Sequence, residues 1–477
     1  MKPRIKREPK LWEALIPVIL LMGLIGVSVV GMQTSAHIAL VLGIMIASFV
    51  GWRLGYSWHE MEQAMIYGIN LGLQACLILM TVGILIGLWI LGGIVPAMIN
   101  YGLKLISPSV FLVSSCIICC VVSLATGSSW STAGTVGLAL IGIGKSLGIS
   151  LPMVAGAIIS GAYFGDKMSP LSDTTNLAPA AAGTDLFTHI RHMVYTTGPS
   201  LAIALTLYGF LDFHNSAKVE AGQDVLIMLE AIQRQFSISP WLLIPPLAVV
   251  AMVVMRIPAL PALFVGCLLG AMTAWVFQGS SVSVIFSAAL DGFRSQTGTA
   301  AVDELLTRGG LLSMMPTLAM IFAALGFGGV MEKTGLLARI AASVLFFARN
   351  VGLLVTTTIL TCISFNFLAA EQYISIIIPG RMYREAFRRY NLHPKNLSRC
   401  LEDSGTLSSP LVPWNTCGAF MAAVLGVSPW LYAPYAFLNL INPMVSIFYG
   451  FTGITMEKLP ETNMEPGKDA IPKMNIM

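Results

Sequence analysis

Residues 161–176 combine charged, hydroxyl and amide side chains in a segment whose neighbours are apolar. Two carboxylates, Asp166 and Asp173, occur here together with Lys167. The neutral oxygen donors of the segment are Ser169, Ser172, Thr174, Thr175 and Asn176. A proline and two glycines interrupt the helix and free backbone carbonyls, which together with carboxylates and hydroxyls are the ligands that a small hard cation prefers. The segment therefore predicts an ion site, with sodium held at Asp166 and Asp173.

Two other interpretations of this segment stay open. Asp166 can form a buried ion pair with its neighbour Lys167, or the segment can be a loop tip outside the hydrocarbon. The apolar runs on both sides, residues 151–164 and 177–182, argue against a loop tip. A charge in lipid costs at least about 2.5 kcal/mol, so charged side chains there need a compensating partner.

Two further polar clusters interrupt apolar segments. The first, residues 126–134, contains Ser128, Ser129 and Thr132. Such hydroxyls at the start of a half-helix can bind an anion or part of a cation shell, or they can simply bond to the backbone of their own helix. The second cluster comprises Glu371, Gln372, Glu402, Asp403, Ser409, Asn415 and Thr416. We predict Glu371 and Asp403 as further cation or proton ligands, with pairing of Asp403 to Arg399 as the open alternative.

Composition identifies the broad class of protein. Of 477 residues, 56% are hydrophobic and 10% are charged, and the mean hydropathy is +0.79. Apolar runs long enough to cross roughly 30 Å of hydrocarbon recur along the chain. We therefore expect an all-α polytopic membrane protein of roughly 11–14 membrane segments, some of them broken or re-entrant. The basic N-terminus precedes an apolar segment without a cleavage pattern, so it is predicted to be uncleaved and cytoplasmic.

Several other functions are disfavoured by the residues. The eight cysteines lie in apolar segments without metal-ligand partners, which argues against disulfides and zinc. Gly144-Lys145-Ser146 resembles the end of a phosphate-binding loop, but Ala139 stands where its first glycine would be. The net charge of +4 is explained by cytoplasmic lysines and arginines, so nucleic acid is not an expected partner. No enzyme activity and no cofactor are predicted.

The chain shows signs of an internal duplication. Ser169-Pro170-Leu171 recurs as Ser409-Pro410-Leu411, and Gly92-Gly93 recurs as Gly328-Gly329. We predict a first transmembrane repeat over residues 1–210, a polar linker over 211–238, a second repeat over 239–455 and a short polar tail over 456–477. Basic residues crowd one connection of the second half, residues 381–399, whereas its first-half counterpart carries only Lys145. This opposite bias indicates inverted repeats, which are common in secondary transporters.

The run 165–176, together with the cluster at 128–132 before it and residues 409–416 after it, resembles the NhaC-type sodium/proton antiporter family of bacteria. The resemblance extends over nearly the whole chain. It implies a multi-pass inner-membrane antiporter that exchanges sodium ions for protons and needs no cofactor beyond these ions. The family also has members that exchange malate and lactate or transport amino acids, so a small organic anion or an amino acid stays open as a substrate. A homodimer stays open as well.

The mechanism that we expect is competition at one carboxylate. Asp166 or Asp173 binds either sodium or a proton, because burial disfavours the charged carboxylate whereas a bound cation stabilises it. In the alternative, half-helix N-termini hold the carboxylate of an organic substrate beside sodium; a channel or a scaffold is disfavoured. The residues predicted to line the common cavity are Ser128, Ser129, Thr132, Ser169, Thr174, Thr175, Asn176, Ser409, Asn415 and Thr416, near Glu371. Residues 15–24 are predicted to face lipid.

Overall fold

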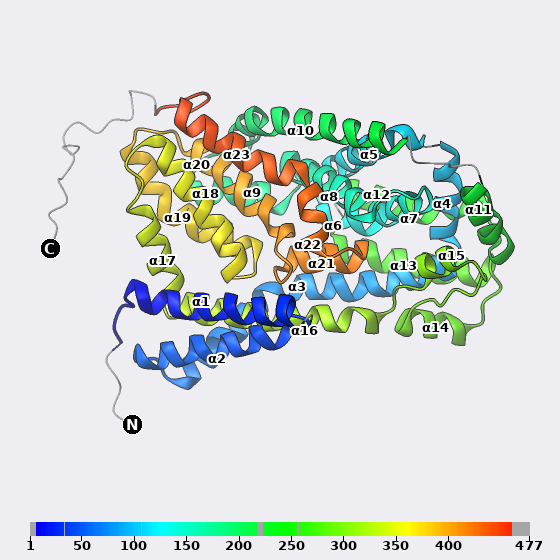
Figure 1. Ribbon diagram of the computed structural model, residues 1–477, viewed down its shortest axis with the longest axis horizontal. Helices are drawn as coiled ribbons and strands as arrows, with labels where there is room; N and C mark the ends of the chain where they lie inside the picture. Colours follow the sequence, from blue (N-terminus) through cyan, green and yellow to red (C-terminus); the bar gives the residue numbers. More distant parts are fainter. Residues whose placement is uncertain (1–5, 33, 106, 217–222, 256, 460–477) are drawn as a thin grey trace.

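The computed structural model describes residues 6–32, 34–105, 107–216, 223–255 and 257–459. Within these ranges all regular elements are helices, and strand-like pairing is limited to two isolated bridges. Lys2 and Arg4 of the basic N-terminus, and residues 460–477 of the predicted tail, lie outside the described residues. The all-helical architecture confirms the predicted fold class (Figure 1).

The helices follow one another along the chain with short connections. Up to residue 216 they are α1 (Leu11–Gly26), α2 (His37–Arg53), α3 (Trp58–Leu91), α4 (Ile94–Leu105), α5 (Phe111–Thr126), α6 (Ser129–Thr132), α7 (Leu138–Ser146), α8 (Leu151–Met168), α9 (Asp173–Ala182) and α10 (Leu186–Ser216). The segment predicted as a polar linker begins inside α10 and contains α11 (Gln223–Gln235).

The remaining helices are α12 (Ile244–Val254), α13 (Ala259–Val276), α14 (Val282–Asp291), α15 (Ala300–Leu306), α16 (Met315–Lys333), α17 (Leu336–Leu345), α18 (Val351–Leu368), α19 (Gln372–Arg389), α20 (Pro394–Leu401), α21 (Thr416–Leu425), α22 (Pro429–Tyr432) and α23 (Phe437–Thr452). Short π-helical turns are η1 (Val27–Gly31), η3 (Ala133–Gly137) and η6 (Glu402–Thr406). Short 3-10 turns are η2 (Pro108–Val110), η4 (Pro240–Leu243), η5 (Leu311–Met314), η7 (Ser409–Leu411) and η8 (Ala433–Tyr435).

Many helices are long and apolar enough to cross a bilayer. By length and composition, seven helices of the described part of the chain qualify, or up to nine if each of two bent pairs counts as one span. Five further apolar helices have 10–17 residues. These findings make the protein a polytopic membrane protein, as predicted, whereas the inverted relation of the two halves stays a prediction.

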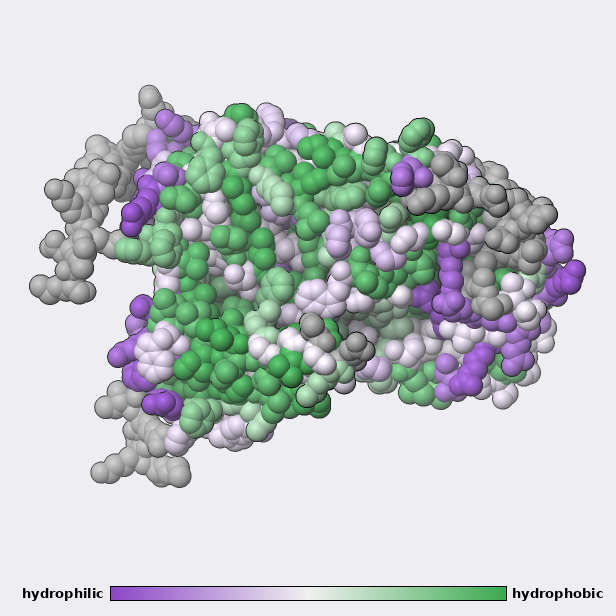
Figure 2. All heavy atoms as spheres, in the orientation of Figure 1, coloured by the Kyte–Doolittle hydropathy of each residue, from purple (hydrophilic) through white to green (hydrophobic). Residues whose placement is uncertain are grey.

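The surface separates into an apolar middle and two polar ends. In Figure 2 hydrophobic residues cover the central part of the face, and hydrophilic residues gather at both ends of the long axis. The long helices α3, α10 and α16 run along this axis in Figure 1, so their length extends across the apolar middle of this face. The start of α1 and the end of α23 lie at the same end of the molecule.

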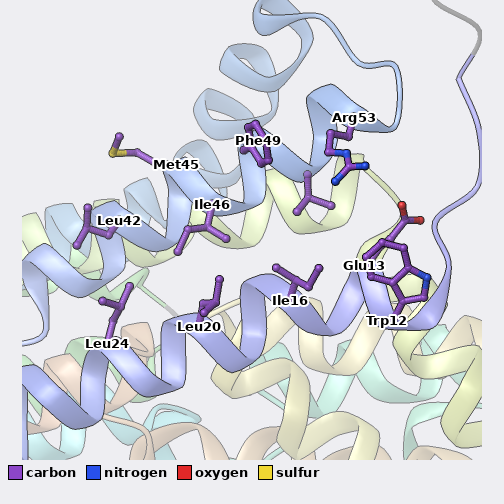
Figure 3. Close-up of a pocket in the computed structure, with 11 residues that line it drawn as sticks. Trp12, Glu13, Ile16, Leu20, Leu24, Leu42, Met45, Ile46, Phe49 and Arg53 are labelled. Atoms are coloured by element: carbon purple, nitrogen blue, oxygen red, sulfur yellow. The ribbon is translucent and has the colours of Figure 1, made fainter.

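The outer face of α1 is available to lipid. Ile19 is 64% exposed whereas Leu21 is 1% exposed, so the predicted lipid-facing segment has one outward and one inward side. A groove of about 540 Å³ lies between α1 and α2. Figure 3 shows Ile16, Leu20 and Leu24 of α1 facing the apolar side chains of α2. Apart from Glu13 and Arg53 its lining is apolar and suits lipid chains, so this groove is not a candidate ion site.

Glycines allow the central helices to pack closely. On α8, Gly161 and Gly165 are spaced four apart and both face α5, as in the small-residue interfaces of membrane helices. A Cβ at Gly161 would lie 2.2 Å from the carbonyl oxygen of Cys116, and one at Gly165 would lie 2.3 Å from the amide nitrogen of Leu124. The close contact of α8 with α5 holds the end of α8, where Asp166 lies.

We expect Gly165→Ala to lower the free energy of unfolding by about 1–3 kcal/mol, because the added methyl group forces α8 away from the backbone of α5. Thermal unfolding of the purified protein in detergent measures the change. Gly23→Ala on α1 is the matched control, since a Cβ there meets nothing within 4 Å. Equal unfolding midpoints for the two variants would show that the close helix contact is not needed.

Candidate functional site

Four helix starts meet around one cavity. The cavity has a volume of about 550 Å³ and is lined by residues at the beginnings of α6, α9, α19 and α21. The N-cap residues of these helices are Ser128, Ser172, Glu371 and Asn415. Each cap side chain accepts a hydrogen bond from a backbone N–H of its own first turn. The positive ends of four helix dipoles are therefore directed toward one space.

Local sequence explains why the helices break at these places. Gly127 ends α5 with a φ of 69°, a conformation that favours glycine. A Cβ at Gly127 would lie 2.7 Å from Cβ of Leu171, so the break after α5 touches the break after α8. In the C-terminal half, Ala370 has a φ of 57°, and the amide of Thr416 donates to its carbonyl oxygen at 3.0 Å. The four breaks thus contact one another in two pairs.

Asp166 is the buried carboxylate on the N-terminal side of the cavity. Its residue is 8% exposed, and its Oδ2 accepts a hydrogen bond from the Ser129 hydroxyl at 2.6 Å and from the Ser129 amide at 3.3 Å. The hydroxyl of Thr175 donates to the carbonyl oxygens of Asp166 and Lys167 at 3.0 Å each, which fixes the last turn of α8. The Asp166 carboxylate is therefore held by the start of α6, and the backbone of the same turn is held by the start of α9.

Glu371 is the buried carboxylate on the other side. It is 3% exposed, and its Oε2 accepts a hydrogen bond from the Thr416 hydroxyl at 2.9 Å. Tyr373 lies between the two sides, because its hydroxyl donates to Oδ2 of Asp173 at 3.5 Å. Asp173 itself is exposed and lines the cavity, which places it where the cavity meets the surroundings. Three carboxylates thus line the same cavity.

The structure places some of the predicted residues in the lining of the cavity and others outside it. Those that line it are Ser128, Ser129, Asp166, Ser172, Asp173, Thr174, Glu371, Gln372 and Thr416. The residues outside the lining are Thr132, Ser169, Thr175, Asn176, Asp403, Ser409 and Asn415. Most of the residues outside the lining form hydrogen bonds to backbone groups near them in the chain. The Thr132 hydroxyl donates to the carbonyl oxygen of Ser128, and the Ser409 hydroxyl donates to that of Thr406. These hydrogen bonds lie within the helical turns at the breaks, outside the cavity lining.

Asp403 lies in a buried ion pair. Its Oδ1 accepts from the Lys167 ammonium group and, at 3.1 Å, from the Thr196 hydroxyl, and neither charged side chain is exposed. Lys167 also donates to Asn442 at 3.0 Å. Neither local pair considered from the sequence forms: Lys167 pairs with Asp403 rather than with Asp166, and Arg399 donates to the Thr455 hydroxyl at 2.7 Å. The ion pair joins α8 to η6 across the molecule.

Several residues of the site were not predicted from the sequence. Gln74 of α3, Trp130, Tyr373 and Cys417 also line the cavity. Gln74 could have been predicted from the sequence, because it is an amide in an otherwise apolar membrane segment. The Trp130 ring stacks on Phe420 with centroids 4.1 Å apart, and only the fold brings these two rings together.

Known proteins resemble this chain over most of its length. The sequence model of the Na+/H+ antiporter family matches residues 161–454, which include Asp166, Glu371 and Asp403. The chain is 42% identical to the Na(+)/H(+) antiporter NhaC of Alkalihalophilus pseudofirmus over 92% of its length and 95% of that protein. The chain belongs to the Na+/H+ antiporter family. The resemblance stated from the sequence motifs is thereby confirmed.

Relatives in this family differ in what their names say they exchange. The chain is 40% identical to a malate-2H(+)/Na(+)-lactate antiporter of Bacillus subtilis, over 94% of its length and 96% of that protein. It is 36% identical to the arginine/ornithine antiporter ArcD of Halobacterium salinarum, over 97% of its length and 96% of that protein. Family membership therefore identifies a transporter class and leaves the substrate to be argued from the site.

Proposed function

We propose that the protein is a secondary antiporter that exchanges sodium ions for protons across the bacterial inner membrane, with its N-terminus in the cytoplasm. The observation that carries the proposal is Asp166, a buried carboxylate that lines a cavity and accepts hydrogen bonds from one neighbouring serine. A buried carboxylate is stable when it carries a proton or binds a cation. Because both use the same oxygen atoms, binding of one expels the other.

The donor set suits a small hard cation. Carboxylate and hydroxyl oxygens of Asp166, Asp173, Ser129 and Thr174 line the cavity, with Glu371 opposite. Oxygen ligands of this kind favour sodium over soft transition metals.

A second candidate substrate is a small organic carboxylate or an amino acid. Two observations favour it: the cavity of about 550 Å³ exceeds the space that one hydrated ion needs, and four helix N-termini face it. Helix N-termini stabilise anions. The names of the relatives from Bacillus subtilis and Halobacterium salinarum point the same way. For this second candidate, sodium binds at Asp166 beside the organic substrate.

Transport in proteoliposomes separates the two candidates. With a pH-sensitive dye inside the vesicles, we expect a sodium gradient alone to change the internal pH, and an equal potassium gradient to have little effect. Labelled malate, lactate and arginine are then offered with and without sodium. If the internal pH changed only when one of these compounds was present, the second candidate would replace the first. Absence of a sodium response under all conditions would contradict both.

A further inference from the structure

The groove between α1 and α2 has one charged end. Its volume of about 540 Å³ is within the range of small-molecule sites. Figure 3 shows Glu13 and Arg53 at one end of the groove and Leu24 and Leu42 at the other. Phe49, which lines the part between them, is 59% exposed. The groove thus combines a polar end with a long apolar part that is open at the surface.

The length of the groove matches one leaflet of a bilayer. Its lining on α1 extends from Trp12 to Leu24. At 1.5 Å per residue, this part of the helix is about 18 Å long. Half of a hydrocarbon core of about 30 Å is about 15 Å. An acyl chain that entered at the charged end would therefore end near the bilayer midplane, where the groove ends too.

Exposed tryptophans place the charged end at the level of the lipid headgroups. Trp12 lies in the first turn of α1, Trp52 in the last turn of α2, and Trp58 begins α3. These side chains are 54%, 47% and 63% exposed. Exposed tryptophans gather at the membrane–water interface. Arg53 follows Trp52 directly, so its guanidinium group lies at the depth of the lipid phosphates.

Arg53 is the cation of the groove without an acidic partner. Glu13 also belongs to the lining, but it accepts from the Arg7 guanidinium group at 2.7 Å, so its charge is compensated. Lys6 of the same N-terminal segment pairs with Glu60. Arg53 is exposed and takes part in no ion pair within the described part of the chain. It is therefore available to an anionic group from outside the protein.

The N-terminal segment is attached beside this end of the groove. The amide of Arg7 donates to the carbonyl oxygen of Leu54, the residue after Arg53, at 3.2 Å. The exposed residues Glu8 and Lys10 have opposite charges and do not line the groove. The lining itself contains one compensated carboxylate and one uncompensated guanidinium group, so the mouth of the groove is positive.

We propose that this groove binds one acidic phospholipid, with its phosphate at Arg53 and one acyl chain along the apolar lining toward Leu24. A guanidinium group matches the geometry of phosphate oxygens. A zwitterionic lipid carries the same phosphate together with its own cation, which competes with Arg53 for it. In the proposed orientation the site faces the cytoplasmic leaflet, where basic pockets between membrane helices bind acidic lipids. The inference does not depend on the substrate of the cavity.

Native mass spectrometry of the purified protein tests the headgroup. The protein is released from detergent that contains equal amounts of phosphatidylglycerol and phosphatidylcholine with the same chains. For the first lipid retained, we expect about fivefold more phosphatidylglycerol, because one basic residue near an acidic lipid contributes about 1 kcal/mol and about 1.4 kcal/mol corresponds to a factor of ten. Arg53→Gln is expected to retain both lipids equally. Arg349→Gln, which changes an exposed arginine outside the groove, should keep the preference.

Two results of this experiment would overturn the proposal. One is equal retention of the two lipids by the unchanged protein. The other is the same preference in the unchanged protein and in Arg53→Gln. Glycerol phosphate, which has the phosphate without the chains, is not expected to displace the lipid. Displacement by glycerol phosphate would indicate a site for phosphate alone and would contradict the proposed position of the chain.

A matched pair of tryptophan variants tests the position of the chain. Leu20→Trp fills the groove, whereas Ile19→Trp adds the same side chain at the adjacent position, which is 64% exposed and outside the lining. We expect only Leu20→Trp to lose the bound phosphatidylglycerol, and thermal unfolding without lipid checks that both variants fold. Equal retention by the two variants would contradict the proposal. A loss of dimers in Leu20→Trp with unchanged lipid retention would instead identify a second copy of the chain as the occupant.

Discussion

Replacing Asp166 with Asn is expected to lower the rate of sodium-driven proton exchange by about 100-fold or more. The asparagine fills the same space and can still accept from Ser129, but it can neither release a proton nor offer a charge to sodium. Removing one partner of a buried charge pair costs about 3–5 kcal/mol, and about 1.4 kcal/mol corresponds to a factor of ten. Sodium-driven pH change in proteoliposomes is the measurement.

Two matched variants make this result interpretable. Asp173→Asn changes the exposed carboxylate of the same cavity, and we expect a smaller loss because solvent already screens this group. Asp291→Asn, at the exposed end of α14, is expected to leave exchange unchanged. Exchange at the unaltered rate in Asp166→Asn would exclude this carboxylate as the shared sodium and proton site.

Removing one member of the Lys167–Asp403 pair is expected to have the largest effect on stability. Asp403→Asn leaves the Lys167 ammonium group buried with neutral partners, and Lys167→Met leaves the Asp403 carboxylate without a cation. Such changes lower the free energy of unfolding by about 3–5 kcal/mol, because an uncompensated buried charge remains. The double variant Lys167→Met, Asp403→Leu removes both charges and is expected to recover most of the lost stability. Thermal unfolding of the purified proteins gives the comparison.

The exposed pair of Arg389 and Glu385 on α19 provides the control. Its closest nitrogen–oxygen distance is 3.7 Å and both side chains are largely exposed, so Glu385→Gln should leave the unfolding temperature nearly unchanged. If Asp403→Asn were as stable as Glu385→Gln, the buried pair would contribute little to holding α8 against η6. If the double variant lost as much stability as each single variant, altered packing rather than an uncompensated charge would explain the loss.

The cavity combines two opposite electrostatic features. Four helix N-termini contribute partial positive charge, and Asp166, Asp173 and Glu371 contribute negative charge. Under the proposed function the carboxylates would bind the cation, and the helix N-termini would favour a carboxylate ligand. The same arrangement thus fits relatives whose names describe sodium and proton exchange and relatives whose names describe organic substrates.

Much of the fold and part of the site could be predicted from the sequence, because these features depend on local chemistry. Apolar runs indicated membrane helices, since their length and composition alone decide whether a segment is stable in lipid. Gly127 and Pro170 marked two of the helix breaks, because glycine and proline act on their own backbone. The prediction that Gly161 and Gly165 also interrupt the helix was wrong, since α8 runs through both of them. Asp166 was predicted as a ligand from its neighbours in the chain, and the structure places it at the cavity.

The choice of partners was decided by the packing of distant helices. Lys167 had Asp166 beside it in the sequence, yet its ammonium group pairs with Asp403 of the C-terminal half. Thr132 and Ser409 belong to the predicted polar clusters, but their hydroxyls bond to their own backbone and do not line the cavity. The burial of Glu402 without a hydrogen-bond partner among the described residues was equally hidden. The reason is physical: residue type and spacing set what a side chain can bind, whereas its direction and its neighbours depend on contacts between helices far apart in the chain.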